Sequence, residues 1–254
     1  MTWGHLPEWL NTNHPKLHIV KHEDYIPEKF LPTFSSHVIE LNLHRIKGLS
    51  EQFVYFNDDM FLTAPVKQTD FFKDGLPCDS ALLNPIAMTR RVDHAEINNI
   101  GILNDHFEKN RVIAEHPWKW YNLKYGKFLV RNFLLMPWKH FIGLYEPHLA
   151  SCFLKRTLEE VWREEGEELT RTCSYRFRDS TNVNQWLFRD WQLAKGDFVP
   201  RDMKFGKMFT YGENGNYDEV CDAVRNGKWK MVCINDFEVD DFQARKEKLQ
   251  NAFE

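Results

Sequence analysis

The order of the elements predicted in the first 62 residues constrains the fold most strongly. Residues 16–24 read as a short strand because an apolar run ends in a polar cluster, and residues 35–48 read as a helix that Gly48 can end. Residues 51–62 form a second apolar run with the composition of a strand. Strand, helix and strand in succession are typical of an α/β protein. The sequence therefore predicts an α/β fold with an open mixed sheet flanked by helices.

The rest of the chain predicts mostly helices and one further strand. Residues 88–147 read as a helical insertion broken by prolines, and residues 149–169 and 182–196 read as amphipathic helices. A later strand ends in Asn235-Asp236 and is followed by a final helix. A chain of 254 residues is long enough for a single domain with a substantial core.

Charge and cysteine content exclude some classes of protein. The formal net charge is −4 and the pI is about 6.3, so the chain lacks the basic excess of a general nucleic-acid binder. The five cysteines are scattered without a CxxC pair, which indicates neither a zinc site nor a disulfide framework. A reducing, cytoplasmic setting is the simpler interpretation.

The sequence also limits how the chain can meet a membrane. Its N-terminus lacks the pattern of a signal peptide. The longest apolar segment, residues 126–138, is interrupted by Arg131 and Asn132 and is shorter than the ~20 residues that span a bilayer. We therefore expect a cytoplasmic protein whose only membrane contact is peripheral, at the inner face and through this segment.

Three oxygen-bearing side chains interrupt the apolar run "FVYFNDDMFL" at residues 53–62. Asn57, Asp58 and Asp59 together offer the ligands that a hard divalent cation prefers, although such a triplet is also common in solvated turns. If the strand continues through them, Asp58 and Asp59 point to opposite faces and cannot be equivalent. The sequence alone leaves both readings open.

An Asn-Asp pair and a few basic side chains complete the candidates. Asn235-Asp236 ends a predicted strand, and ligands of open α/β sheets bind at the carboxyl ends of strands. His148 follows a proline at the start of a predicted helix, where a structural role is the more common one. Arg176 and Arg178 share a face of an extended piece and can bind an anion or simply face solvent. These side chains gain meaning only together.

Taken together, these segments resemble a known family, the Stealth proteins. The second conserved region of that family is similar to the block that runs from "LPEWLNTNHPKLHIVKHED" to "LSEQFVYFNDDMFL". The third region is similar to "YEPHLASCFLKRTLEEVW" and "SYRFRDSTNVNQWLF", and the fourth to "VCINDF". Stealth proteins are sugar-1-phosphate transferases of microbial capsule synthesis, related to the catalytic subunit of the animal lysosomal-enzyme N-acetylglucosamine-1-phosphotransferase.

The resemblance divides a single catalytic domain into four parts. It assigns residues 1–87 to the second conserved region, 88–147 to a helical acceptor or lid region, 148–196 to the third region and 229–254 to the fourth. The family's first region, a strand with a "YTWVDG"-like motif, is not found in this sequence. We therefore expect an N-terminally truncated form of a nucleotide-sugar transferase-like fold.

The resemblance implies transfer of a hexose-1-phosphate from a UDP-sugar to a hydroxyl of a glycan acceptor. UMP would leave and a phosphodiester would form, as in capsular or exopolysaccharide synthesis. A metal-dependent glycosyltransferase, which would release UDP, and an inactive truncated remnant are the alternatives. The implied partners are the UDP-sugar donor and the glycan acceptor, and nucleic acid is not among them.

The resemblance also implies a role for each candidate residue. The catalytic residues would be His148 as general base, Arg178 as phosphate clamp and Asp59 as the functional carboxylate. The expected metal is Mg²⁺ or Mn²⁺, held by Asp59 and Asp236. Four further residues would bind the nucleotide-sugar: Asn57, Asp58, Arg45 and Asn235. In the acceptor region, the side chains that could meet a glycan are Lys119, Trp120, Lys124 and Tyr125.

Overall fold

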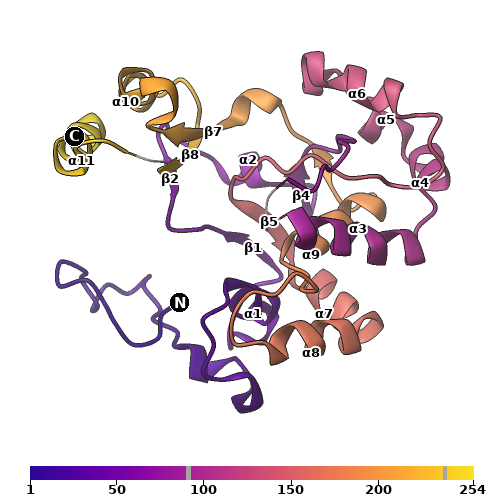
Figure 1. The fold of residues 1–254 in the computed structure, drawn as a ribbon, viewed down its shortest axis with the longest axis horizontal. Helices are drawn as coiled ribbons and strands as arrows, with labels where there is room; N and C mark the ends of the chain where they lie inside the picture. Colours follow the sequence, from indigo (N-terminus) through magenta and orange to yellow (C-terminus); the bar gives the residue numbers. More distant parts are fainter. Residues whose placement is uncertain (90–92, 237–238) are drawn as a thin grey trace.

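The computed structural model describes residues 1–89, 93–236 and 239–254, and it is an α/β structure built from three small sheets and their helices (Figure 1). The strands are β1 Gln52–Tyr55, β2 Met60–Leu62, β3 Phe72–Lys73, β4 Leu76–Asp79, β5 Ser151–Leu154, β6 Val199–Pro200, β7 Gly206–Tyr211 and β8 Met231–Asp236. The α-helices are α1 Ser36–Leu41, α2 Gln68–Phe71, α3 Asp93–His106, α4 Lys109–Glu115, α5 Pro117–Trp120, α6 Leu129–Leu134, α7 Lys155–Glu164, α8 Gly166–Ser174, α9 Trp186–Ala194, α10 Tyr217–Arg225 and α11 Phe242–Phe253. The sheets are β1-β5, β2-β8-β7 and β3-β4-β6, so the α/β class is confirmed.

The prediction of a strand–helix–strand unit at the N-terminus is wrong. Residues 16–24 contain no strand: Lys21 makes an isolated bridge with Thr2, and His22–Asp24 is a 3₁₀-helix. The predicted helix over 35–48 is shorter, because the Asn42 side chain binds the carbonyl of Val38 and ends α1. A 3₁₀-helix, η3 Leu43–Arg45, follows.

The strand predicted over residues 51–62 is two strands in two sheets. The amide of Met60 binds the carbonyl of Asn57, so a turn separates β1 from β2. β1 pairs antiparallel with β5, whereas β2 pairs antiparallel with β8, with Met60 opposite Cys233. The acidic triplet therefore lies where the chain passes between two sheets.

The helix predicted over residues 149–169 is wrong at its start. Residues Ser151–Leu154 form strand β5, and all four are buried. A short apolar run with no exposed face has no distinctive period, and a buried strand then looks like a buried helix. Helices α7 and α8 follow, separated by Glu165. His148 consequently lies in the loop before a strand, not at the start of a helix.

The hydrophobic core consists of separate clusters, which lie at the two ends of the molecule and in its centre. Helices α10 and α11 cover one face of β2-β8-β7, where Phe209, Val220 and Ala252 pack (Figure 1). The other face of this sheet, with Met60 and Cys233, packs against β5. Helix α9 contacts both β5 and α3, so it joins the central sheet to the helical end. All five cysteines are buried and free.

The segment predicted as a helical insertion is mostly helical in its described part. Helices α3 to α6 form the end of the molecule opposite to α10 and α11 (Figure 1). Residues 90–92 of this segment lie outside the described residues. Within the described parts of the chain, no helix combines the length and the apolar character that crossing a bilayer requires.

Candidate active site

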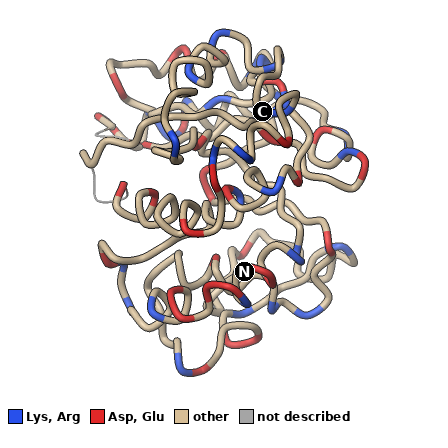
Figure 2. Tube along the Cα trace, turned by 90° about the vertical axis from the view of Figure 1, so that its right-hand side faces the viewer, with Lys and Arg blue, Asp and Glu red and all other residues tan. Residues whose placement is uncertain are grey.

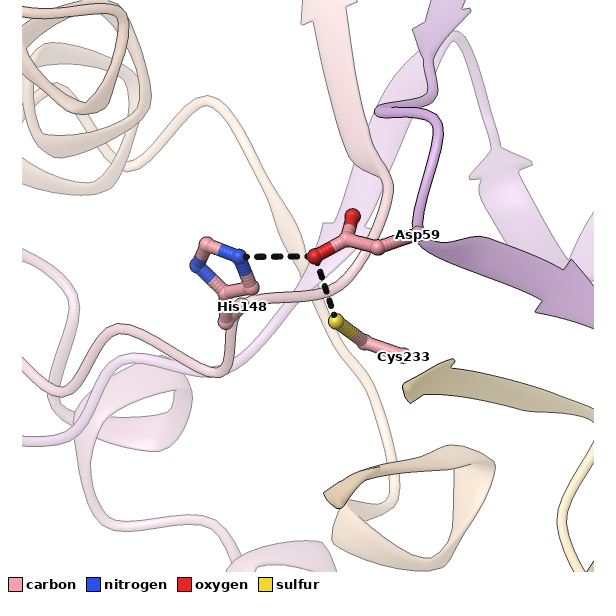
Figure 3. Close-up of side chains that lie close together, drawn as sticks. All are labelled: Asp59, His148 and Cys233. Atoms are coloured by element: carbon pink, nitrogen blue, oxygen red, sulfur yellow. Dashed lines mark hydrogen bonds and ion pairs between the residues drawn. The ribbon is translucent and has the colours of Figure 1, made fainter. Parts of the chain in front are cut away.

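Three side chains from distant parts of the sequence meet in one place. Asp59 precedes β2, His148 lies in the loop before β5, and Cys233 is on β8, and all three point toward one another (Figure 3). His148 Nε2 lies 3.4 Å from Asp59 Oδ2, and the Cys233 thiol donates to the same oxygen at 3.2 Å. Both His148 and Cys233 therefore contact the same carboxylate oxygen, Oδ2 of Asp59.

The backbone fixes these positions. The carbonyl of Asp59 accepts a hydrogen bond of 2.8 Å from the amide of Ile234, which extends the β2–β8 pairing and places Asp59 beside Cys233. His148 has a left-handed φ of 46°, a conformation that costs free energy in a residue with a side chain. Its ring lies 6.4 Å from the ring of Trp186 on α9. The imidazole thus has both Asp59 and Trp186 as neighbours.

The two oxygens of Asp59 have different surroundings. Oδ2 contacts His148 and Cys233, whereas Oδ1 is buried without a hydrogen-bond partner, as is Oδ1 of Asn57. Buried acceptors without a partner cost about 1–3 kcal/mol each, and a bound cation is one way to satisfy them. Two such oxygens in one turn fit a hard divalent cation, which prefers oxygen ligands.

Cys233 is the third member of this group and donates its thiol proton to Asp59. Burial raises the pKa of the Cys233 thiol above its usual value, and the hydrogen bond to Asp59 raises it further. In this arrangement the thiol acts as a hydrogen-bond donor to Asp59. The donor set of Asp59 and Asn57 oxygens suits Mg²⁺ or Mn²⁺ better than a soft metal.

Asp58 and Asp59 are inequivalent, as the sequence predicted. The residue Asp58 is exposed, whereas the side chain of Asp59 is 23% exposed and contacts two partners. The cause differs from the predicted alternation along a strand, because both residues lie in a turn. Asp59 is the carboxylate that faces His148.

Asn235 and Asp236 end β8, but the strand directs them to opposite faces. By alternation Asn235 shares the face of Cys233, whereas Asp236 shares the face of Ile234. Asp236 lines a cavity of about 360 Å³ beside α11, together with Phe242. The structure therefore does not bring Asp236 into the group formed by Asp59, His148 and Cys233. The sequence reasoning overlooked the alternation at this point.

Arg178 belongs to a second polar cluster, around α1. It donates from Nη2 to the Ser36 hydroxyl at 2.7 Å. The Tyr55 hydroxyl, at the end of β1, donates to Glu40 Oε1 at 3.3 Å. Because Tyr55 precedes the acidic turn by two residues, it joins this cluster to the site of Asp59.

Two members of this second cluster were missed. They are His37 and Glu40, polar residues of α1 that are both buried. Burial raises the pKa of Glu40 to about 7, and the hydrogen bond from Tyr55 and the charge of Arg178 oppose that rise. Burial lowers the pKa of His37 to about 4, and Arg178 lowers it further. Their three-residue spacing shows only that they share a helix face, not which face is buried.

Arg45 has other partners. It donates to Asn42 Oδ1 at 2.9 Å, and its guanidinium lies 4.7 Å from the centre of the Trp162 ring. These contacts join η3 to α7. The structure thus gives Arg45 a packing role, and its predicted role in nucleotide-sugar binding stays a prediction.

The four predicted acceptor residues differ in how far they are buried. Trp120 and Tyr125 are fully buried in the core, so the prediction that they meet a glycan is wrong. Lys119 donates to the carbonyl of Gly196 at 2.6 Å. Lys124 alone of the four is exposed. Aromatic and basic residues in one segment could not be sorted into core and surface from the sequence.

Two adjoining cavities lie near His148. A cavity of about 410 Å³ extends from Pro147, next to His148, to Lys127 and Phe128 before α6. It shares Arg201 and other lining residues with a cavity of about 460 Å³. The second cavity is lined by six basic residues: Lys73, Lys124, Arg201, Lys204, Lys228 and Lys230. The first cavity therefore offers cationic and aromatic side chains next to the loop of His148.

A buried charge cluster supports the loop of His148. Arg189 on α9 donates from Nε and Nη2 to the two oxygens of Asp79, at 2.8 and 2.9 Å, and from Nη1 to Glu146 at 3.1 Å. Burial and the charge of Asp190 raise the pKa of Glu146 well above its usual value. Glu146 precedes His148 by two residues, so the cluster fixes the loop from behind. No local sequence pattern marks this cluster.

The site has the components of an enzyme that moves a charged group: a carboxylate paired with a histidine, open oxygen ligands and cationic walls. Comparison with known proteins agrees with this class. A family model described as Stealth protein CR2, conserved region 2, matches residues 1–78. The chain is 41% identical over 256 residues to a capsular polysaccharide phosphotransferase WcwK of Streptococcus pneumoniae, covering 100% of this chain and 76% of that protein.

Two other relatives carry related names. The chain is 38% identical to the exopolysaccharide phosphotransferase cps2G of Lactiplantibacillus plantarum, over 98% of this chain and 74% of that protein. It is 40% identical to the receptor polysaccharide phosphotransferase WefC of Streptococcus gordonii, over 91% of this chain and 69% of that protein. The chain is thus a transferase of phosphorus-containing groups, and it belongs to the Stealth family.

Proposed function

We propose that this protein transfers a hexose-1-phosphate from a UDP-sugar to a hydroxyl of a glycan, in the synthesis of a capsular or exopolysaccharide. The proposal is supported by the names of the relatives, which are polysaccharide phosphotransferases. The observation that carries it is the pairing of His148 with Asp59 Oδ2, beside an Asp59 Oδ1 that has no partner. That arrangement offers a base and an open oxygen ligand side by side.

In the proposed reaction the acceptor hydroxyl attacks the phosphorus that carries the sugar. A new oxygen–phosphorus bond forms, the bond to the bridging oxygen breaks, and UMP leaves with that oxygen. His148 takes the hydroxyl proton. His148 Nε2 lies 3.4 Å from Asp59 Oδ2, so a proton on Nε2 would leave Nδ1 as the base, and the carboxylate would stabilise the imidazolium that results.

The charge of the pyrophosphate requires neutralisation. Asp59 Oδ1 and Asn57 Oδ1 would hold Mg²⁺ or Mn²⁺, with Asn235 on the same face of β8 as Cys233. When bound, the cation would neutralise negative charge on the phosphates. Arg178, whose planar fork suits phosphate oxygens, would bind the donor from the α1 side. Roles for Asp58, Arg45 and Asp236 in donor or metal binding remain predictions.

The glycan would occupy the cavity that starts at Pro147. The rings of Phe128 and Tyr145 lie 6.0 Å apart and nearly parallel on its wall, and such flat apolar faces pack well against sugar rings. Lys127 and Arg201 line the same cavity and suit an acceptor that carries phosphate. The acceptor hydroxyl would then approach His148 from the side of Pro147.

Product analysis tests the reaction. The protein is incubated with a UDP-hexose, a glycan acceptor and Mn²⁺, and the products are identified by ³¹P NMR and mass spectrometry. We expect UMP and a new phosphodiester, whereas release of UDP would indicate glycosyl transfer and contradict the proposal. His148→Ala should lose most turnover, and His140→Ala, an exposed histidine after α6, serves as its matched control. Full turnover of His148→Ala would overturn the role of His148 as base.

A further inference from the structure

Large apolar side chains gather on the surface around α6. Six of them, each at least 50% exposed, define what is here named the α6 surface: Leu123, Val130, Phe133, Leu134, Met136 and Trp138. Large exposed apolar side chains that gather around one short helix are typical of interaction sites in soluble proteins. Single exposed apolar residues elsewhere on the chain are ordinary by comparison.

The orientation of α6 is fixed by its opposite face. Asn132 is buried, accepts from the amide of Leu83 at 2.7 Å, and donates to the carbonyls of Ala81 and Trp120. Residues three and four apart share a helix face, so Val130, Phe133 and Leu134 share one face, and Val130 and Leu134 lie opposite Asn132. The hydrogen bonds of Asn132 therefore direct the apolar face outward, and rotating α6 to turn that face toward the core would break them.

The charge around this surface has one sign. No Asp or Glu occurs between Glu115 and Glu146, whereas the same stretch contains five Lys and Arg residues. Lys124, Lys127 and Lys139 among them are exposed. The whole chain has a formal net charge of −4, and charges of both signs are spread along the trace when it is viewed from the α4–α6 side (Figure 2). The absence of acidic residues is therefore a local property.

We propose that the α6 surface docks the protein on a membrane that contains anionic lipid. Trp, Phe and Leu side chains interleaved with lysines match the interface of a bilayer, where apolar groups enter the acyl boundary and lysines meet anionic headgroups. Protein–protein interfaces, in contrast, are depleted in lysine at their core. The surface is complementary in charge to such a membrane and repels a basic partner.

This docking would place the acceptor cavity near the lipid. Lys127 and Phe128 precede α6 directly, and both line the cavity that ends at Pro147 beside His148. A membrane that contacts the α6 surface would therefore lie next to the Lys127 end of that cavity. The proposal does not depend on the phosphotransfer reaction, because it concerns where the protein sits and is tested without any substrate.

Vesicle sedimentation tests the proposal on the full chain. Vesicles of phosphatidylcholine with about a third phosphatidylglycerol are compared with pure phosphatidylcholine at low and high salt. We expect binding to the anionic vesicles that is weaker in high salt, with each lysine contributing about fivefold to partitioning. Failure to bind anionic vesicles, or equal binding to neutral ones, would overturn the proposal.

Two variants separate the apolar and the basic contributions. Phe133→Ser/Leu134→Ser and Lys124→Gln/Lys127→Gln/Lys139→Gln should each reduce partitioning at least tenfold, while circular dichroism shows an unchanged fold. Trp9→Ser removes an aromatic side chain that is 83% exposed but lies outside the α6 surface, and it should bind as the parent does. If the apolar variant instead converts a dimer to a monomer in sedimentation velocity without changing vesicle binding, the surface joins two copies and the proposal is wrong.

Discussion

The substitution Asp79→Asn should destabilise the fold strongly. Asp79 and Arg189 are almost fully buried and share two hydrogen bonds, of 2.8 and 2.9 Å. An asparagine amide would turn one of these into a donor facing a donor and would remove the negative charge beside a buried guanidinium. Breaking one partner of a buried pair costs about 3–5 kcal/mol, a large share of the ~5–15 kcal/mol that folds a typical domain.

Glu146→Gln should cost much less, although Glu146 also contacts Arg189. Burial raises the pKa of Glu146, and the side chain hydrogen-bonds to Asp190, so Glu146 is the neutral member of the cluster. A glutamine has nearly the same shape as a protonated glutamate and can both accept from Arg189 and donate to Asp190. We expect a loss below about 1 kcal/mol, within the range of a near-neutral exchange.

Urea unfolding followed by circular dichroism measures both variants. Glu51→Gln is the control, because Glu51 pairs with Arg156 at a half-exposed position where an ion pair is worth about 1 kcal/mol or less. An unchanged slope against urea shows that only stability has changed. A loss below about 1 kcal/mol for Asp79→Asn, or equal losses for the two cluster variants, would refute this reasoning.

Two further substitutions test the buried polar groups. Burial raises the pKa of Glu40 to about 7, so between its ordinary pKa and pH 7 the folded chain holds a proton that the unfolded chain has released. The stability of the parent should therefore fall as the pH rises from about 5 to about 8. In urea titrations, Glu40→Gln should be more stable than the parent by up to about 3 kcal/mol at pH 8 and should equal it near pH 4.5. A stability difference that is independent of pH would contradict this assignment. Asn132→Ala leaves one amide and two carbonyls of the backbone without their partner, so thermal unfolding should show a loss of about 2–4 kcal/mol, and a loss below about 1 kcal/mol would show that water replaces the side chain.

The sequence predicted the helical half of the fold better than its sheets. Helix α9 and the stop at Gly196 follow from the apolar period and from a residue that adopts a positive φ of 71°. The strand that ends in Asn235-Asp236 was also predicted. Strand β5 was missed because it is buried on all sides, and the break between β1 and β2 was missed because both flanks are apolar. Pairing partners set these boundaries, and they lie far away in the sequence.

The candidate site was predicted in part. The family resemblance selected Asp59 and His148, and the structure brings them to 3.4 Å. Cys233 was missed because a lone cysteine in an apolar strand carries no signal of its own. Asp236 was placed with Asp59 although its register on β8 directs it to the other face. Contacts between side chains therefore needed the geometry of the sheet, which local patterns do not contain.

The measurement that tests the central claim most directly compares Asp59→Asn with Asp58→Asn. The two substitutions remove the same charge from neighbouring residues, but only Asp59 contacts His148. We expect Asp59→Asn to lower the turnover number for UMP release by about 100-fold or more, the loss typical of a group that stabilises charge in the transition state. Asp58→Asn, at an exposed position, should lower it by about threefold or less. Equal losses in the two variants, or full turnover of Asp59→Asn, would contradict the assignment of Asp59 as the functional carboxylate.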